Sequence, residues 1–130
     1  MKKPSKAQQE EVRRLVADVT PEEEYEVHAR FRWAEKQARL RGAADRLLEG
    51  VRTLWEMLTD PDYVIRWETK AWIIAGLTYF ISPIDAIPDP IPSLGYLDDA
   101  LVIAWVHHQI EDEVARYRVK RRRTGAVRDL

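Results

Sequence analysis

The chain has 130 residues, of which 45% are hydrophobic and 33% charged, with a formal net charge of −1. This length supplies one domain with one modest core, and the balance of residues is typical of a folded protein. The sequence contains no cysteine, which excludes disulfides, thiol catalysis and cysteine-ligated zinc or iron–sulfur centres.

The N-terminal stretch MKKPSKAQQEE has a basic start, but no apolar run follows it. A secretory signal needs such a run. We therefore expect a protein of the cytoplasm, or of the cytoplasmic face of a membrane, and not a secreted one.

Capping patterns predict where the first helices begin and end. Ser5 with Gln8 and Thr20 with Glu23 are both capping-box pairs, and Gly42 is a typical stop for the second helix. Across residues 44–58 apolar residues recur at three–four spacing, which predicts a third helix.

A fourth helix is expected from about residue 63 to 81 and a fifth from about 98 to 122. No strand-like alternation occurs. The predicted fold is therefore all-α, a small bundle of about five helices, with a helical hairpin joined by a long proline-rich ordered turn. Residues 1–42 are interpreted as an N-terminal helical extension, 43–115 as the hairpin domain and 116–130 as a basic tail.

The hairpin is unusually apolar. The stretch AWIIAGLTYFI (Ala71–Ile81) is hydrophobic on every face, as is ALVIAWV (Ala100–Val106), which indicates burial all round, in a core or in lipid. Neither reaches the roughly 20 apolar residues of a spanning helix. We expect a buried or half-inserted hairpin rather than two membrane spans.

The connection from Ser82 to Leu97 is longer than most loops of compact domains. Ser82 and Pro83 resemble a short helix start, and the later prolines predict a stiff, extended course. Gly95 is expected to adopt a positive φ. Asp98 or Asp99 is expected to cap the fifth helix.

The sequence YFISPIDAIPDPIPSLGYLDD resembles the signature of the YkvA-like family, a bacterial domain of unknown function. Ala86 and Pro90 replace the Leu and Phe that are common in that pattern. The resemblance covers roughly Ala44 to Val106 and implies a helical hairpin that is commonly treated as membrane-associated, with no established biochemical activity. The matching positions are Ser82, Pro83, Ile84, Asp85, Ile87, Pro88, Asp89, Ile91, Pro92, Gly95, Asp98 and Asp99.

Two groups of residues are candidates for chemistry. The turn aspartates Asp85, Asp89, Asp98 and Asp99 could converge on a divalent cation, although capping and turn formation also explain isolated aspartates. The pairs His107–Glu111 and His108–Asp112 are each four residues apart on a helix, which suits two metal ligands or an acid–base couple; such pairs are also common surface ion pairs.

The tail is basic, with a compact cluster at Lys120, Arg121, Arg122 and Arg123. Such a cluster is typical of contact with an anionic surface, and it also suits the negative end of a helix. No nucleic-acid-binding motif accompanies it, so nucleic acid is not the expected partner.

Three functions remain open. The first is a non-enzymatic binding or structural module that docks peripherally on a membrane surface or membrane partner through its apolar hairpin, without a cofactor. The second is a metal-assisted hydrolase that uses the turn aspartates with His107 or His108. The third is a helical scaffold that binds a protein partner or a second copy of itself.

Overall fold

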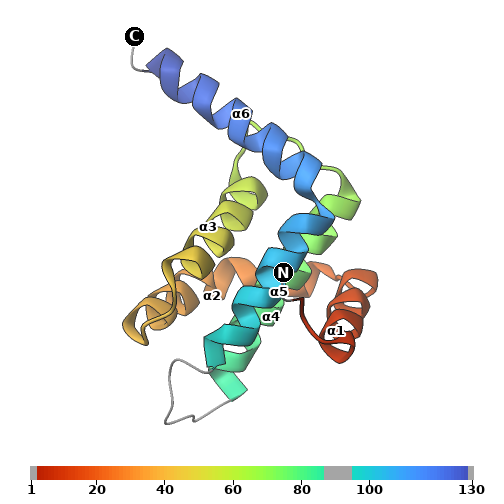
Figure 1. Cartoon of the computed structure of the whole chain (residues 1–130). Helices are drawn as coiled ribbons and strands as arrows, with labels where there is room; N and C mark the ends of the chain where they lie inside the picture. The colour runs from red at the N-terminus through yellow and green to blue at the C-terminus, as the bar shows by residue number, and fades with distance from the viewer. Residues whose placement is uncertain (1–2, 87–94, 129–130) are drawn as a thin grey trace.

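The computed structural model describes residues 3–86 and 95–128, with side chains at 3–81 and 98–123. Within these residues the chain is helical and contains no strand, which confirms the all-α prediction, with one helix more than expected (Figure 1). In chain order the helices are α1 (Lys6–Ala17), α2 (Pro21–Leu40), α3 (Asp45–Thr59), α4 (Trp67–Ala86), α5 (Gly95–Gln109) and α6 (Glu111–Arg128).

The predicted helix starts and stops are confirmed at the N-terminal end. Ser5 and Gln8 form the full capping box of α1. The Thr20 side chain accepts a hydrogen bond from the backbone N–H of Glu23 at the start of α2. Gly42, after α2, has a φ of 83°, a conformation that glycine adopts without steric cost.

Helix α4 lies at the centre of the bundle, where α1, α2, α3 and α5 all contact it (Figure 1). Ile73, Ile74, Leu77 and Phe80 are completely buried. A helix with protein on all sides buries every face, which explains its all-round apolar sequence. Across the residues that the structure describes, every helix is too short or too polar to cross a membrane.

Helix α4 is shifted along the sequence relative to the prediction. It begins at Trp67 rather than near Tyr63, because Asp60 forms a turn in which its carboxylate accepts from the N–H of Asp62 and its carbonyl from that of Tyr63. It then continues through Ser82 and Pro83 to Ala86, so the predicted helix start at Ser82 is wrong. A proline removes one helical hydrogen bond, and the buried turn before it holds the helix together.

The expected fifth helix is two helices. The backbone N–H of Ile110 is shared between the carbonyl oxygens of Val106 and His107, both at 3.3 Å, and this tightened turn separates α5 from α6. At its other end α5 begins at Gly95. Asp98 and Asp99 therefore lie inside the helix, and the prediction that one of them is its N-cap is wrong.

Candidate functional site

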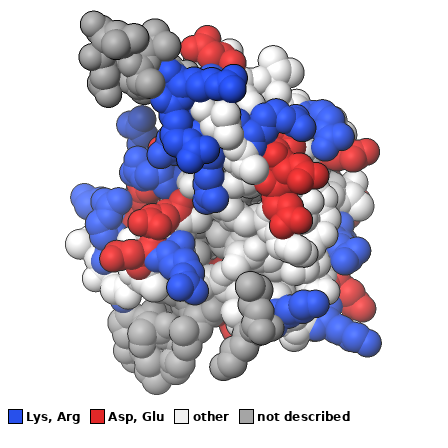
Figure 2. All heavy atoms as spheres, turned by 45° about the horizontal axis from the view of Figure 1, so that its top comes forward, with Lys and Arg blue, Asp and Glu red and all other residues white. Residues whose placement is uncertain are grey.

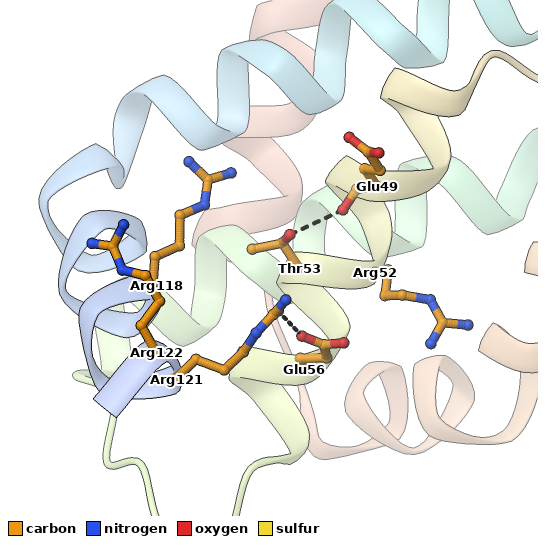
Figure 3. A pocket seen from close by; sticks show the side chains of 7 residues that line it. All are labelled: Glu49, Arg52, Thr53, Glu56, Arg118, Arg121 and Arg122. Carbon is orange, nitrogen blue, oxygen red and sulfur yellow. Dashed lines mark hydrogen bonds and ion pairs between the residues drawn. The ribbon is translucent and has the colours of Figure 1, made fainter. Parts of the chain in front are cut away.

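A groove of about 410 Å³ separates α3 from α6 (Figure 3). It forms because α6 turns away from α5 at Ile110 and crosses the C-terminal end of α3 (Figure 1). Residues three and four apart on a helix share a face, so the basic residues of α6 are presented to α3 together. The lining residues are Glu49, Arg52, Thr53, Glu56, Arg118, Arg121 and Arg122.

Two basic residues of α6 hold the helix in place. The Lys120 ammonium lies 2.7 Å from a carboxylate oxygen of Asp60, and the Tyr117 hydroxyl donates to the same oxygen at 3.1 Å. Arg121 pairs with Glu56 of α3 (Figure 3). The hydrogen bond from Lys120 is the main cause that lowers the pKa of Asp60. Lys120 and Arg121 therefore have structural partners.

Arg118, Arg122 and Arg123 differ from these two. None of them forms an ion pair or hydrogen bond with the residues that the structure describes. Arg118 and Arg122 are four residues apart, and Figure 3 shows both side chains extending from α6 at the groove. The predicted cluster Lys120–Arg123 thus divides into two residues that anchor α6 and two with open guanidinium groups. Sequence reasoning missed Arg118, although its spacing to Arg122 was a signal.

On the opposite wall of the groove, formed by α3, Arg52 and Thr53 already have hydrogen-bond partners. Arg52 forms two hydrogen bonds to the carboxylate of Glu35 in α2, at 3.1 and 2.9 Å, and Figure 3 shows it directed away from the α6 arginines. The Thr53 hydroxyl donates to the backbone carbonyl of Glu49 at 3.0 Å. An anion in the groove would therefore be held by the arginines of α6, because the Thr53 hydroxyl already donates its proton to Glu49.

A second hollow of about 270 Å³ shares Glu49 and Arg118 with the groove and runs between α3 and α5. Leu47 and Ile103 form part of its apolar wall, and Arg46 stands at its edge. His107 also lines it, with its Nε2 2.9 Å from the carbonyl oxygen of Gly50. Because burial lowers the pKa of His107, the imidazole is neutral near pH 7 and donates this bond from Nε2.

The histidine pairs expected from the sequence are not formed. His107 bonds Gly50 rather than Glu111. His108 pairs with Glu111, three residues later, at 3.2 Å rather than with Asp112. The His108–Glu111 pair lines a hollow of about 210 Å³ beside α4, with both side chains largely exposed to solvent.

The turn aspartates are only partly within the described residues. The backbone of Asp85 belongs to the last turn of α4, while Asp89, Pro88 and Pro92 lie outside the described residues. Asp98 is exposed and Asp99 is buried. Within the described ranges, no three His, Asp or Glu side chains are grouped to hold a metal ion.

The surroundings of Asp99 shift the pKa of its carboxyl group. It is 1% exposed, and its Oδ2 has no hydrogen-bond partner among the described residues. Burial, and then the neighbouring Asp98, raises the pKa of Asp99 to about 8. Burial together with both aspartates also raises the pKa of Tyr79. Asp99 is therefore mainly protonated at pH 7.

Two comparisons with known proteins match part of the chain. A family model described as "Protein of unknown function (DUF1232)" matches residues 69–105, which lie in α4, the connection and α5. The protein called "Uncharacterized membrane protein YkvA" from Bacillus subtilis (strain 168) is 33% identical over 75 residues, covering 54% of this chain and 70% of that protein. No solved structure matches the chain. The α6 side of the groove lies outside the matched residues 69–105.

Proposed function

The chain belongs to the DUF1232 family of YkvA-like proteins, and from this premise we propose that it is a binding module that docks peripherally on an anionic membrane surface. The relative from Bacillus subtilis is called a membrane protein. The observation that carries the proposal is the group of three arginines on α6, Arg118, Arg122 and Arg123, that have no partner among the described residues.

These arginines suit the phosphates of lipid headgroups. A guanidinium group can donate two parallel hydrogen bonds to a phosphate, and each basic residue near an anionic bilayer contributes about 1 kcal/mol. Val119 is 39% exposed on the same helix, one turn before Arg123, and adds apolar contact. Figure 2 shows Lys and Arg side chains at the end of the molecule that carries α6 and elsewhere on this face, with Asp and Glu side chains between them.

The proposal moves the docking surface away from the hairpin. The apolar side chains described in α4 and α5 are largely buried against other helices, including Ile74 and Val102, which are completely buried. They contribute to the core of the bundle and are not available to lipid without unfolding. Among the described surfaces, we therefore expect α6 to make the first contact with a bilayer.

Flotation of the full chain tests the proposal, using phosphatidylcholine vesicles with and without anionic phosphatidylglycerol. The variant Arg118→Gln/Arg122→Gln/Arg123→Gln removes three open cations. At about 1 kcal/mol each, binding to anionic vesicles should weaken about a hundredfold. High salt should weaken wild-type binding too, because exposed charges are screened.

A matched control removes the same charge elsewhere. Lys6→Gln/Arg14→Gln/Arg41→Gln changes three exposed cations outside the groove and should retain most of the binding. An equal loss of binding in both variants would show that net charge alone explains the effect, and would contradict a specific role for α6. Wild-type protein that stays off anionic vesicles at low salt, while folded and monodisperse, would overturn membrane docking and favour a scaffold for a protein partner.

A further inference from the structure

The outer face of α2 is apolar and uncovered. Tyr25 and Leu40 are each 71% exposed, Trp33 is 46% exposed, and Ala29 is exposed between them. At 100° per residue these four positions fall within one narrow stripe. The buried residues of α2 lie on the opposite side of the helix and include Val27, Phe31, Ala34 and Ala38. One side of α2 thus packs into the bundle, and the other offers large side chains to a partner.

Two pairs of positions on this face mirror each other about Ala29. Four residues before Ala29 is Tyr25, and four after it is Trp33. Seven residues before it is Glu22, and seven after it is Lys36.

The next pair of positions follows the same rule. Glu26 and Arg32 are each three residues from Ala29, on opposite edges of the stripe. On this face Glu22 and Glu26 therefore have basic residues at their mirror positions, and Tyr25 has an aromatic residue.

We propose that this face is a homodimer interface, in which the α2 helices of two copies pack antiparallel about a twofold axis at Ala29. In this register Tyr25 of each copy meets Trp33 of the other. A twofold interface uses the same patch on both copies, so each contact occurs twice. The small side chain at the axis lets the two helices approach closely.

Charge selects the antiparallel direction. With Ala29 opposite Ala29, Glu22 of one copy faces Lys36 of the other across the interface. A parallel pair would instead place each carboxylate beside its own copy, which is repulsive. Glu26 and Arg32 lie on the two edges of the stripe, and Glu26 contacts Arg30 of its own helix at 3.3 Å, so the Glu22–Lys36 pair sets the direction.

The same charges argue against lipid as the occupant. Glu22 lies within the stripe and Glu26 at its edge, so an anionic bilayer would be repelled by the N-terminal half of this face. A second, antiparallel copy of α2 places its basic half against the acidic half of the first and its acidic half against the basic one. Because one helix pair buries less area than a standard stable interface, the dimer should dissociate in the micromolar range.

Sedimentation equilibrium of the full chain at micromolar concentrations tests the dimer. Glu22→Lys/Glu26→Lys makes the face wholly basic and should weaken the dimer at least tenfold. Arg32→Glu/Lys36→Glu makes it wholly acidic and should do the same. An equimolar mixture of the two variants should dimerise again, and so should the variant that carries all four changes. The control Glu10→Lys/Asp62→Lys, at two exposed positions outside α2, should dimerise like the wild type.

The absence of natural cysteine allows the register to be tested by single cysteines. Ala29→Cys places two thiols at the axis, and mild oxidation should link the copies. Leu40→Cys lies eleven residues from the axis, which separates the two thiols by roughly 33 Å in the antiparallel register, beyond the reach of a disulfide. It should stay unlinked.

Three results would overturn the proposal. The first is a wild-type chain that remains monomeric throughout the micromolar range. The second is a four-residue charge exchange that stays monomeric while its circular dichroism matches the wild type. The third is efficient linkage through Leu40→Cys but not through Ala29→Cys, which would show a parallel or unrelated contact.

Discussion

Tyr63, in the loop before α4, donates a 2.7 Å hydrogen bond from its hydroxyl to a carboxylate oxygen of Glu113 in α6. Glu113 is 2% exposed, and the Arg66 guanidinium lies 3.3 Å from its other oxygen. Burial, and then this bond, raises the pKa of Tyr63 to about 12. The contact attaches the first turn of α6 to the loop that follows α3, and so places the arginines of α6 beside α3.

Glu113→Ala should therefore destabilise the protein by about 2 kcal/mol, because it removes the carboxylate that accepts the short hydrogen bond from Tyr63 and pairs with Arg66. Urea denaturation measures the loss. Glu111→Ala, whose side chain is 67% exposed in its contact with His108, is the control and should cost less than about 0.5 kcal/mol. Similar losses in both variants would show that the buried contact does not hold α6.

Lys120→Met should raise the pKa of Asp60, because the hydrogen bond from Lys120 is the main cause that lowers it. A carboxyl whose folded pKa is lowered stabilises the protein above its unfolded pKa of about 4 and loses that contribution as the pH falls through the folded value. The variant should be less stable than the wild type by about 0.5–1 kcal/mol at pH 7, with a smaller difference below pH 4. NMR titration of Asp60 checks the pKa, and an unchanged value would contradict the ion pair.

Asp99→Asn should stabilise the protein in a pH-dependent manner. The folded pKa of Asp99 is about 8, against an ordinary value of 3.8. The folded protein therefore holds a proton that the unfolded chain releases, and stability falls as the pH rises from about 4 to 8. Asparagine removes this dependence. Its advantage should be near zero at pH 4 and exceed about 1 kcal/mol at pH 8.

Thermal unfolding across this pH range measures the effect of the Asp99 substitution. Asp98→Asn, at the exposed neighbour, is the matched control and should show no such growth with pH. An Asp99→Asn variant that is less stable than the wild type at pH 8 would mean that the carboxylate form is the one that the fold requires.

Gly50→Ala should destabilise the contact between α3 and α5. Alanine in place of glycine usually stabilises a helix by about 1 kcal/mol, but here the added Cβ would lie 2.9 Å from Cγ2 of Ile103. Overpacking of this kind costs about 1–3 kcal/mol, so a net loss of about 1 kcal/mol is expected. In an Ile103→Ala background the same change should become neutral or stabilising. A stabilising Gly50→Ala in the wild-type background would refute the close approach.

Local signals in the sequence predicted much of the fold. The caps at Ser5 and Thr20 and the stop at Gly42 depend on a few neighbouring residues, so they could be read directly. The apolar character of α4 indicated burial on all sides. It could not distinguish lipid from protein, because both environments favour the same side chains. The packing of α1, α2, α3 and α5 around α4 decided in favour of protein for the described residues.

The local rules failed at the two helix ends that flank the connection. Ser82 and Pro83 resemble a helix start, yet α4 continues through them to Ala86. Asp98 and Asp99 resemble caps, yet α5 begins at Gly95. In both places the helix extends beyond the boundary that the capping residues predict, because a preference of about 1 kcal/mol does not fix a helix end by itself.

By itself the sequence determined the all-α class, the family and the presence of a basic C-terminal segment. Only the tertiary structure decided what each basic residue does. Lys120 meets Asp60 and Arg121 meets Glu56, pairs more than fifty residues apart in the chain, whereas Arg118 and Arg122 remain open at the groove. In the sequence, nothing distinguishes the basic residues that form ion pairs from those that remain open. The difference arises when α6 crosses α3, because only some positions of a helix can face the carboxylates of its neighbour.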